Sequence, residues 1–165
     1  MQTLTILKQL DFFEGLTNVQ LEIIASICQE RHCWIEEMIF DENSASDELY
    51  IIARGTVDIQ VDPSLVGRQR SDEKSQLVTI ATLNSGQIFG EVALVDQGLR
   101  SAAARCAANN THLLIIPRDK LMLLCTSFPE LGFRLMYNLA AELAMKIRDT
   151  DLAIREQLLW NPSRP

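Results

Sequence analysis

The feature that most constrains the fold is a series of short, closely spaced β-type segments in the middle of the chain. Between residues 33 and 116, stretches rich in Ile, Val, Leu and Thr are separated by polar or glycine-containing breaks. In the segment TVDIQV, the apolar Val57, Ile59 and Val61 alternate with polar residues, which predicts a strand with one buried face. Such a series of short strands predicts an antiparallel sandwich or barrel of the jelly-roll type. The polar residues 62–76 are expected to form a long loop.

Helical signals flank this β region on both sides. Thr17 and Gln20 have the spacing of a capping box, and Pro129 stands where a helix can begin with proline in its first turn. With 165 residues, the chain is long enough for one domain with a sizeable core and too short for two of ordinary size. We therefore predict a single domain over residues 1–165, mainly β with flanking helices. Its parts are an N-terminal helical part at about 1–32, a β-roll at about 33–117 and C-terminal helices at about 118–160.

The last helical region carries a narrow apolar stripe. Its members recur at spacings of three, four or seven residues, with charged side chains beside them. They are Met136, Ala140, Leu143, Ile147, Ile154 and Leu158. A stripe of this width is typical of a helix that pairs with its own copy, so a homodimer through this helix is one prediction. Packing of the helix on its own domain explains the stripe equally well.

Composition excludes some classes of partner. The formal net charge is −7 and the pI is about 4.8, whereas a protein that follows the phosphate backbone of nucleic acid normally needs a basic face. No apolar run approaches the length of a membrane span, and the first residues lack the features of a signal peptide. We expect a cytoplasmic protein that binds neither nucleic acid nor membrane directly.

The cysteines and histidines form no recognisable metal or redox motif. The four cysteines match no zinc or redox spacing and are expected to be buried, reduced thiols. Jelly rolls also carry metal-dependent enzymes, whose sites generally need two or more imidazoles and a carboxylate. His32 and His112 are eighty residues apart and neither has a histidine beside it in the sequence. We therefore expect no metal site and no enzymatic activity.

Residues 89–102, FGEVALVDQGLRSA, combine the groups that a small anionic ligand needs. An apolar run and a turn separate Glu91 from Arg100, so the chain can fold back and present both side chains to one ligand. Arg100 offers a charged, planar donor fork for a phosphate, and the amides at Gly90 begin a helical turn of the kind that stabilises anions. Glu91 can then accept a hydrogen bond from a hydroxyl, which fits a ribose phosphate. A solvated surface ion pair is the competing interpretation of the spacing alone.

The same segment resembles the phosphate-binding cassette of the cyclic nucleotide-binding domain family, which includes catabolite activator protein and the protein kinase A regulatory subunit. The family pattern is roughly F-G-E-x-A-L, a short variable turn and R-[ST/A]-A. Each position is filled here, by Phe89, Gly90, Glu91, Ala93, Leu94, Arg100, Ser101 and Ala102. The resemblance extends along almost the whole chain and implies an antiparallel β jelly roll, also called a double-stranded β-helix.

This resemblance also implies roles for individual residues. Arg100 pairs with the exocyclic oxygens of a cyclic phosphate, and Glu91 accepts from the ribose 2′-hydroxyl. The rest of the phosphate and ribose cradle is Gly90, Val92, Ala93, Ser101 and Ala102. The apolar bed under sugar and base is Ile59, Ile80 and Ala81. The residues that cover the base from the C-terminal helix are Lys146, Arg148, Thr150 and Leu152, with Trp160 as an aromatic cap.

The function expected from the resemblance is a regulatory sensor whose C-terminal helix moves when a cyclic nucleotide binds. The ligand is cAMP or cGMP, with cAMP favoured although Ser101 occurs in relatives that prefer either. No other cofactor is expected. Because the chain ends soon after the predicted helix, we expect a stand-alone sensor that acts through an unidentified downstream protein, or else a fragment of a Crp-like transcription regulator. Residues 42–47 replace the usual Gly-Asp pairs of the family. A degenerate member that binds no nucleotide and serves as a protein-interaction module therefore remains an alternative.

Overall fold

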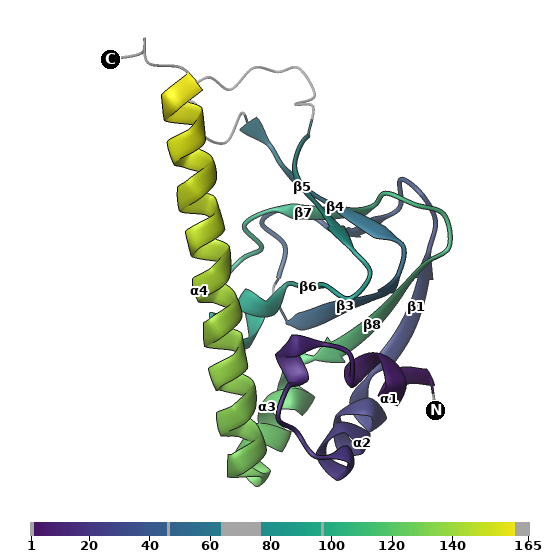
Figure 1. Ribbon diagram of the computed structural model, residues 1–165. Coiled ribbons are helices and arrows are strands. Elements are labelled where there is room, and N and C mark those ends of the chain that lie inside the picture. The colour runs from purple at the N-terminus through teal and green to yellow at the C-terminus, as the bar shows by residue number, and fades with distance from the viewer. Residues whose placement is uncertain (1, 46, 64–76, 97, 161–165) are drawn as a thin grey trace.

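Two four-stranded antiparallel sheets form the centre of the computed structural model, which describes residues 2–45, 47–63, 77–96 and 98–160 (Figure 1). The first sheet has the order β1 (Gln29–Cys33), β8 (Thr111–Pro117), β3 (Glu48–Arg54) and β6 (Ile88–Phe89). The second has the order β2 (Met38–Phe40), β7 (Ala103–Cys106), β4 (Thr56–Val61) and β5 (Val78–Asn84). Each sheet thus joins strands that are distant in the sequence, which confirms the predicted jelly roll.

Helices flank the β-roll, as predicted. The N-terminal part contains α1 (Gln2–Leu7), the 3-10 turn η1 (Asp11–Phe13) and α2 (Asn18–Ile27). The C-terminal part contains α3 (Arg118–Ser127) and the long α4 (Pro129–Trp160), which runs along one side of the roll (Figure 1). The capping box at α2 is confirmed: the Thr17 hydroxyl accepts from the Gln20 amide at 3.3 Å, and the Gln20 side chain accepts from the Thr17 amide at 2.8 Å.

The core has two layers, one on each face of the first sheet. Leu49, Ile51, Leu114 and Ile116 point toward the helices, where they pack with apolar residues of α1, α2, α3 and α4. The neighbouring strand residues point the other way, into the space between the sheets, because side chains alternate along a strand. The first half of α4 therefore belongs to the core of its own domain.

The apolar stripe of α4 packs against the core in the first half of the helix, whereas its described members in the second half are exposed. Met136 and Leu143 pack against the helical layer of the core, which confirms packing on the same domain for the first half of the helix. Ile147 and Ile154 are exposed in the second half, with 62% of Ile147 accessible to solvent. In the part of the chain that the structure describes, no helix is both long and apolar enough to span a bilayer.

Two local features differ from the predictions. β1 begins at Gln29, inside the part expected to be helical, because the polar residues 29–32 carry no alternating signal and are held as a strand by pairing with β8. In the β4–β5 ladder Ile59 pairs with Ala81 and Gln60 with Thr79, so Ile80 is skipped. This bulge breaks the expected alternation: Gln60 is buried and Val61 only half-buried. Most of the predicted 62–76 loop lies outside the described residues.

Candidate functional site

A hollow of about 430 Å³ lies where the second sheet, the segment after β6 and α4 meet. Its apolar wall comes from β2, β4, β5 and β6 through Phe40, Ile59, Ala81, Leu83 and Phe89. Its polar wall comes from the 90–102 segment and from Lys146, Asp149 and Thr150 of α4. The hollow is therefore shaped for a ligand with one apolar and one charged part.

The charged end of the hollow is built on a tight turn at Gly90. Gly90 has a φ of +72°, and a Cβ there would lie 2.5 Å from Nη1 of Arg100 and 3.0 Å from the Glu48 carbonyl oxygen, so only glycine fits. The 3-10 turn η3 (Glu91–Leu94) follows directly, with the Ala93 amide donating to the Gly90 carbonyl at 3.1 Å. The amides of Glu91 and Val92 begin the turn, and first-turn amides lack partners within the helix. They are the backbone donors available to an anion.

Arg100 is a buried cation that contacts no carboxylate in the part of the chain that the structure describes. Its side chain is 5% exposed, with Nη2 donating to the Glu48 carbonyl at 2.9 Å and Nη1 to the Gly90 carbonyl at 3.4 Å. The guanidinium lies 4.2 Å from the ring centre of Phe40, and its buried Nε has no hydrogen-bond partner. Among the described residues, none of the ion pairs involves Arg100. Burying a guanidinium without a counter-charge costs free energy. The site therefore favours a ligand that brings a negative charge.

The loop that departs from the family pattern supports the backbone of Arg100. The Asn43 amide donates to the Arg100 carbonyl at 2.8 Å, and the Arg100 amide donates to the Ser44 carbonyl at 2.9 Å. Asn43 adopts a φ of +63°, which asparagine tolerates better than most residues. The segment that replaces the usual Gly-Asp pairs is thus hydrogen-bonded directly to the backbone of Arg100.

Glu91 faces α4, where it forms an ion pair with Lys146. Its Oε1 lies 2.9 Å from Nζ of Lys146, and Oε1 of Glu142 lies 3.3 Å from the same ammonium. Glu91 is buried, whereas the Lys146 side chain is 40% exposed. Burial raises the pKa of the Glu142 carboxyl, and the Lys146 ammonium partly offsets this rise. The carboxylate expected to accept from a ribose is therefore occupied by a group of the C-terminal helix.

The hollow brings together most of the residues predicted for the site. Gly90, Glu91, Val92, Arg100, Ser101, Ala102, Ile59, Ala81, Lys146 and Thr150 all line it. Ala93 is fully buried beneath the turn, and its amide is already used within η3. Thr150 directs its hydroxyl to the Lys146 carbonyl at 2.8 Å.

Three predicted residues lie elsewhere. Ile80 is 59% exposed and does not line the hollow, because the β5 bulge skips it and leaves Ala81 and Leu83 on the ligand side. Arg148 and Leu152 are exposed on α4 and are also not among the lining residues. The side chain of Trp160 lies outside the described part of the structure.

Phe40, Leu83, Asp96 and Asp149 line the hollow without having been predicted from the sequence. Phe40 stacks on Arg100, and its only sequence signal was membership of a short apolar segment. Asp96 accepts from the Gly98 amide at 2.9 Å and so orders the turn before Arg100. Asp149 was passed over as an ordinary charged position beside the apolar stripe.

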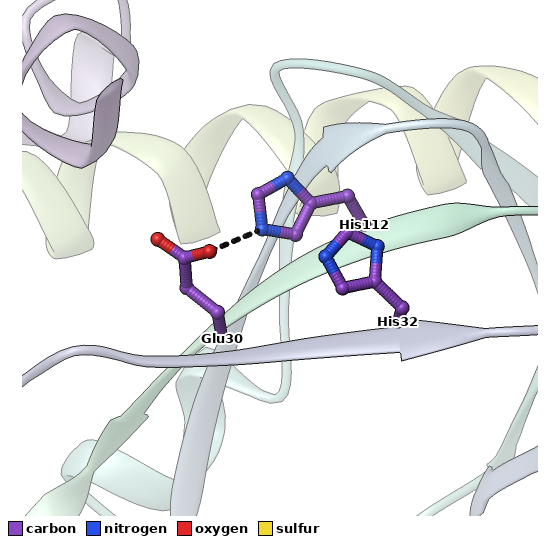
Figure 2. Close-up of side chains that lie close together, drawn as sticks. All are labelled: Glu30, His32 and His112. Carbon is purple, nitrogen blue, oxygen red and sulfur yellow. Dashed lines mark ion pairs between the residues drawn. The ribbon is translucent and has the colours of Figure 1, made fainter.

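His32 and His112, although eighty positions apart in the sequence, are neighbours in the fold. His32 on β1 pairs directly with His112 on β8, and their rings stack with centres 4.4 Å apart (Figure 2). Glu30 joins them on the same strand face (Figure 2). The cysteines agree better with expectation: all four are free, Cys33 and Cys106 are buried, and Cys28 and Cys125 are half-buried.

The comparisons with known proteins agree with this geometry. The family model of the cyclic nucleotide-binding domain matches residues 31–128, which is more than half of the chain. The chain belongs to the cyclic nucleotide-binding domain family. The matched region contains the whole 89–102 cassette and all eight strands of the described roll except the first two residues of β1.

Individual relatives support the same assignment. The cyclic AMP receptor protein of Thermus thermophilus is 32% identical over 148 residues, covering 90% of this chain and 62% of that protein. The crystal structure of the catabolite activator protein from Thermus thermophilus has a TM-score of 0.69 at 30% identity, covering 89% of this chain and 62% of that one. A cyclic nucleotide-binding domain from Methylobacillus flagellatus has a TM-score of 0.77 at 24% identity, covering 94% and 82%, and supports the fold. The chain thus spans about three fifths of the length of the Thermus proteins.

Proposed function

We propose that this cyclic nucleotide-binding domain binds cAMP in preference to cGMP and serves as a regulatory domain without catalytic activity. The observation that carries the proposal is the buried guanidinium of Arg100, which has no carboxylate partner among the described residues and borders the hollow. A guanidinium has five N–H donors, of which two are used by carbonyls, so Nε and the remaining N–H groups are available to a phosphate. The cyclic phosphate then supplies the missing negative charge.

The apolar wall supports a nucleoside as the rest of the ligand. Ile59, Ala81 and Leu83 line the hollow opposite the charged residues, where a sugar and a base would be shielded from water. The choice of adenine over guanine is supported by the Thermus relative, which is named a cyclic AMP receptor protein. Ser101 lies beside Arg100 on the polar wall, where its hydroxyl is available to the phosphate or to the base.

The ion pair between Glu91 and Lys146 supports a mechanism for signalling through α4. In the proposed complex, the ribose 2′-hydroxyl donates to Glu91 and competes with Lys146 for its Oε1. The loss of this contact releases the middle of α4 from the turn at β6, where Lys146 also approaches the Ile88 carbonyl. The ligand thus distinguishes two positions of the helix, which is what a regulatory signal requires.

The second half of α4 supports a homodimer as the unit that carries the signal. Ile147 and Ile154, seven positions apart and so on the same side of the helix, are each at least half exposed there, which leaves apolar surface in contact with water. Pairing of α4 with a second copy would bury them. A change in the tilt of α4 would then alter what the dimer presents to an unidentified downstream protein. Direct contact with nucleic acid or membrane is not part of this proposal.

Calorimetric titration of the chain with cAMP and cGMP tests the binding proposal. Loss of a charge-assisted, bidentate contact costs about 1.5 to 3 kcal/mol, so Arg100→Leu should weaken binding at least about tenfold. Arg105→Leu is the matched control, because Arg105 lies on β7 and pairs with Glu36 instead of lining the hollow. Circular dichroism checks that both variants fold. Equal affinity in Arg100→Leu and the wild type contradicts the site, and no binding of either nucleotide favours the degenerate alternative.

A further inference from the structure

The strand register gathers Glu30, His32 and His112 on one face of the first sheet. Residues 30 and 32 are two positions apart on β1 and so point to the same side, and His112 lies directly opposite His32 on β8. Figure 2 shows the three side chains converging, with the Glu30 carboxylate beside the imidazole of His112. This face carries the helical layer of the core, and none of the three residues lines the nucleotide hollow.

The ligand-type atoms of these three side chains are close enough to bind one ion. One nitrogen or oxygen atom from each residue lies within 4.8 Å of the others, and Oε2 of Glu30 lies 3.3 Å from Nε2 of His112. In a tetrahedral zinc site with bonds of about 2.0 to 2.1 Å, ligand atoms are separated by about 3.3 Å. The pair formed by Glu30 and His112 already has this spacing. His32 and Glu30 are exposed, so small side-chain rotations can bring in the third ligand.

Among the described residues, His112 presents a buried ring nitrogen without a hydrogen-bond partner to the cluster. It is 8% exposed, and its buried Nε2 has no hydrogen-bond partner, because the nearby Glu30 oxygen is within ion-pair distance but poorly aligned. The other carboxylate oxygen of Glu30 accepts from the Thr3 hydroxyl of α1 at 3.1 Å. Outer-shell hydrogen bonds of this kind orient metal-binding carboxylates. A metal ion would give the buried nitrogen a partner and balance the charge of the Glu30 carboxylate at once.

We infer that Glu30, His32 and His112 form a binding site for a late first-row divalent metal ion, with Zn²⁺ as the ion it takes. Two imidazoles and one carboxylate suit Zn²⁺ better than the hard cations Ca²⁺ and Mg²⁺, which prefer all-oxygen sites. The open side of the cluster leaves a position for water or another ligand. Such an ion would fasten β1 to β8 and, through Glu30 and Thr3, to α1.

Zinc titration of the untagged, metal-stripped chain tests the site. The chain contains only two histidines, so both imidazoles can be followed individually by NMR. We expect one Zn²⁺ per chain and movement of both histidine signals together. His32→Ala and Glu30→Gln should each weaken binding at least about tenfold, since each removes one ligand. Glu156→Gln, an exposed carboxylate on α4, is the control and should leave affinity unchanged.

The outcomes separate this site from other ways of binding zinc. His112→Ala removes a buried side chain and can lower stability, so the conclusion depends on the exposed His32 and Glu30. Titration with Co²⁺ identifies the ligand type, because thiolate coordination adds strong near-ultraviolet absorption that imidazole coordination lacks. A thiolate spectrum, unchanged affinity in His32→Ala, or no zinc binding at millimolar concentration overturns the inference. The cAMP affinity of His32→Ala should equal that of the wild type, so a failure here leaves the nucleotide proposal untouched.

Discussion

Replacing Lys146 by methionine tests whether the C-terminal helix competes with the ligand. Methionine retains an unbranched apolar side chain of similar reach but lacks the ammonium that lies 2.9 Å from Glu91. If the ribose hydroxyl must displace this ammonium, the substitution weakens the free state and leaves the bound state unaffected. Lys146→Met should therefore bind cAMP more tightly than the wild type. A role for Lys146 as a cover over the base predicts the opposite, a loss of affinity.

The size of the effect follows from the exposure of the two partners. A hydrogen bond to a charged group contributes about 1.5 to 3 kcal/mol when well shielded. Because the Lys146 side chain is 40% exposed and also shares its charge with Glu142, we discount this to about 1 kcal/mol. Since 1.4 kcal/mol corresponds to a factor of ten, the dissociation constant should fall about fivefold. The same contact is lost from the free protein, whose thermal stability should fall.

Isothermal titration calorimetry of the wild type and Lys146→Met with cAMP, at one ionic strength, measures the change in dissociation constant. Arg148→Met is the matched control, because Arg148 is exposed on the same helix and does not line the hollow. Its affinity for cAMP should equal that of the wild type. A weaker affinity of Lys146→Met than of Arg148→Met refutes the competition argument and supports direct contact between Lys146 and the nucleotide.

Four further perturbations test other parts of the structure. Gly90→Ala should lower the free energy of unfolding in urea by about 1 to 2 kcal/mol, because the left-handed φ disfavours alanine. It should also weaken cAMP binding, because the added Cβ would displace Arg100, and unchanged binding would contradict this. Burial raises the pKa of the Cys28 and Cys106 thiols to about 12, so both should resist iodoacetamide at pH 8 in the native protein and react in denaturant. Mass spectrometry measures the labelling, and rapid modification of the native protein would contradict this expectation. Ile147→Glu should leave the fold intact and yield monomers in light scattering; a monomeric wild type would rule out the dimer. Linear 5′-AMP should bind at least about tenfold more weakly than cAMP in the same calorimeter, since its second negative charge meets no unpaired cation among the described lining residues, where Lys146 still has Glu142 beside it; equal affinities would disprove this.

The charged part of the site could be predicted because it is continuous in the sequence. Glu91 and Arg100 belong to one cassette of fourteen residues, and the hollow contains both. The apolar wall could not be placed as well, because its residues come from separate strands whose register depends on a bulge. Ala81 and Leu83, two positions apart on β5, line the hollow, whereas the bulge leaves Ile80 unpaired and outside it. No local pattern in the sequence signals such a skip.

Contacts across the fold were beyond the sequence for a related reason. The separation of eighty positions between His32 and His112 does not indicate their distance in space until β1 is known to pair with β8. Likewise, the Glu48 carbonyl that accepts from Arg100 is a backbone atom and has no sequence signature. The α4 stripe changes from packed at Leu143 to exposed at Ile147, because the helix extends beyond the core between them. The sequence spacing of these two residues does not indicate that point.

The charge balance of the hollow explains why a cyclic phosphate suits it. Five ionisable side chains line its described part: Glu91, Asp96, Asp149, Arg100 and Lys146. Lys146 is already paired with a carboxylate, so Arg100 is the cation left to balance a ligand, and it can balance one charge. A cyclic phosphodiester carries one negative charge, whereas an open phosphate monoester carries about 1.5 to 2 at neutral pH. In the proposed complex, Lys146 gives up Glu91 but still has the Glu142 carboxylate beside it, 3.3 Å away in the free protein, so the second charge of a monoester meets no unpaired cation among the described lining residues. We therefore expect this arrangement of charges to distinguish the closed phosphate ring before any contact with the base.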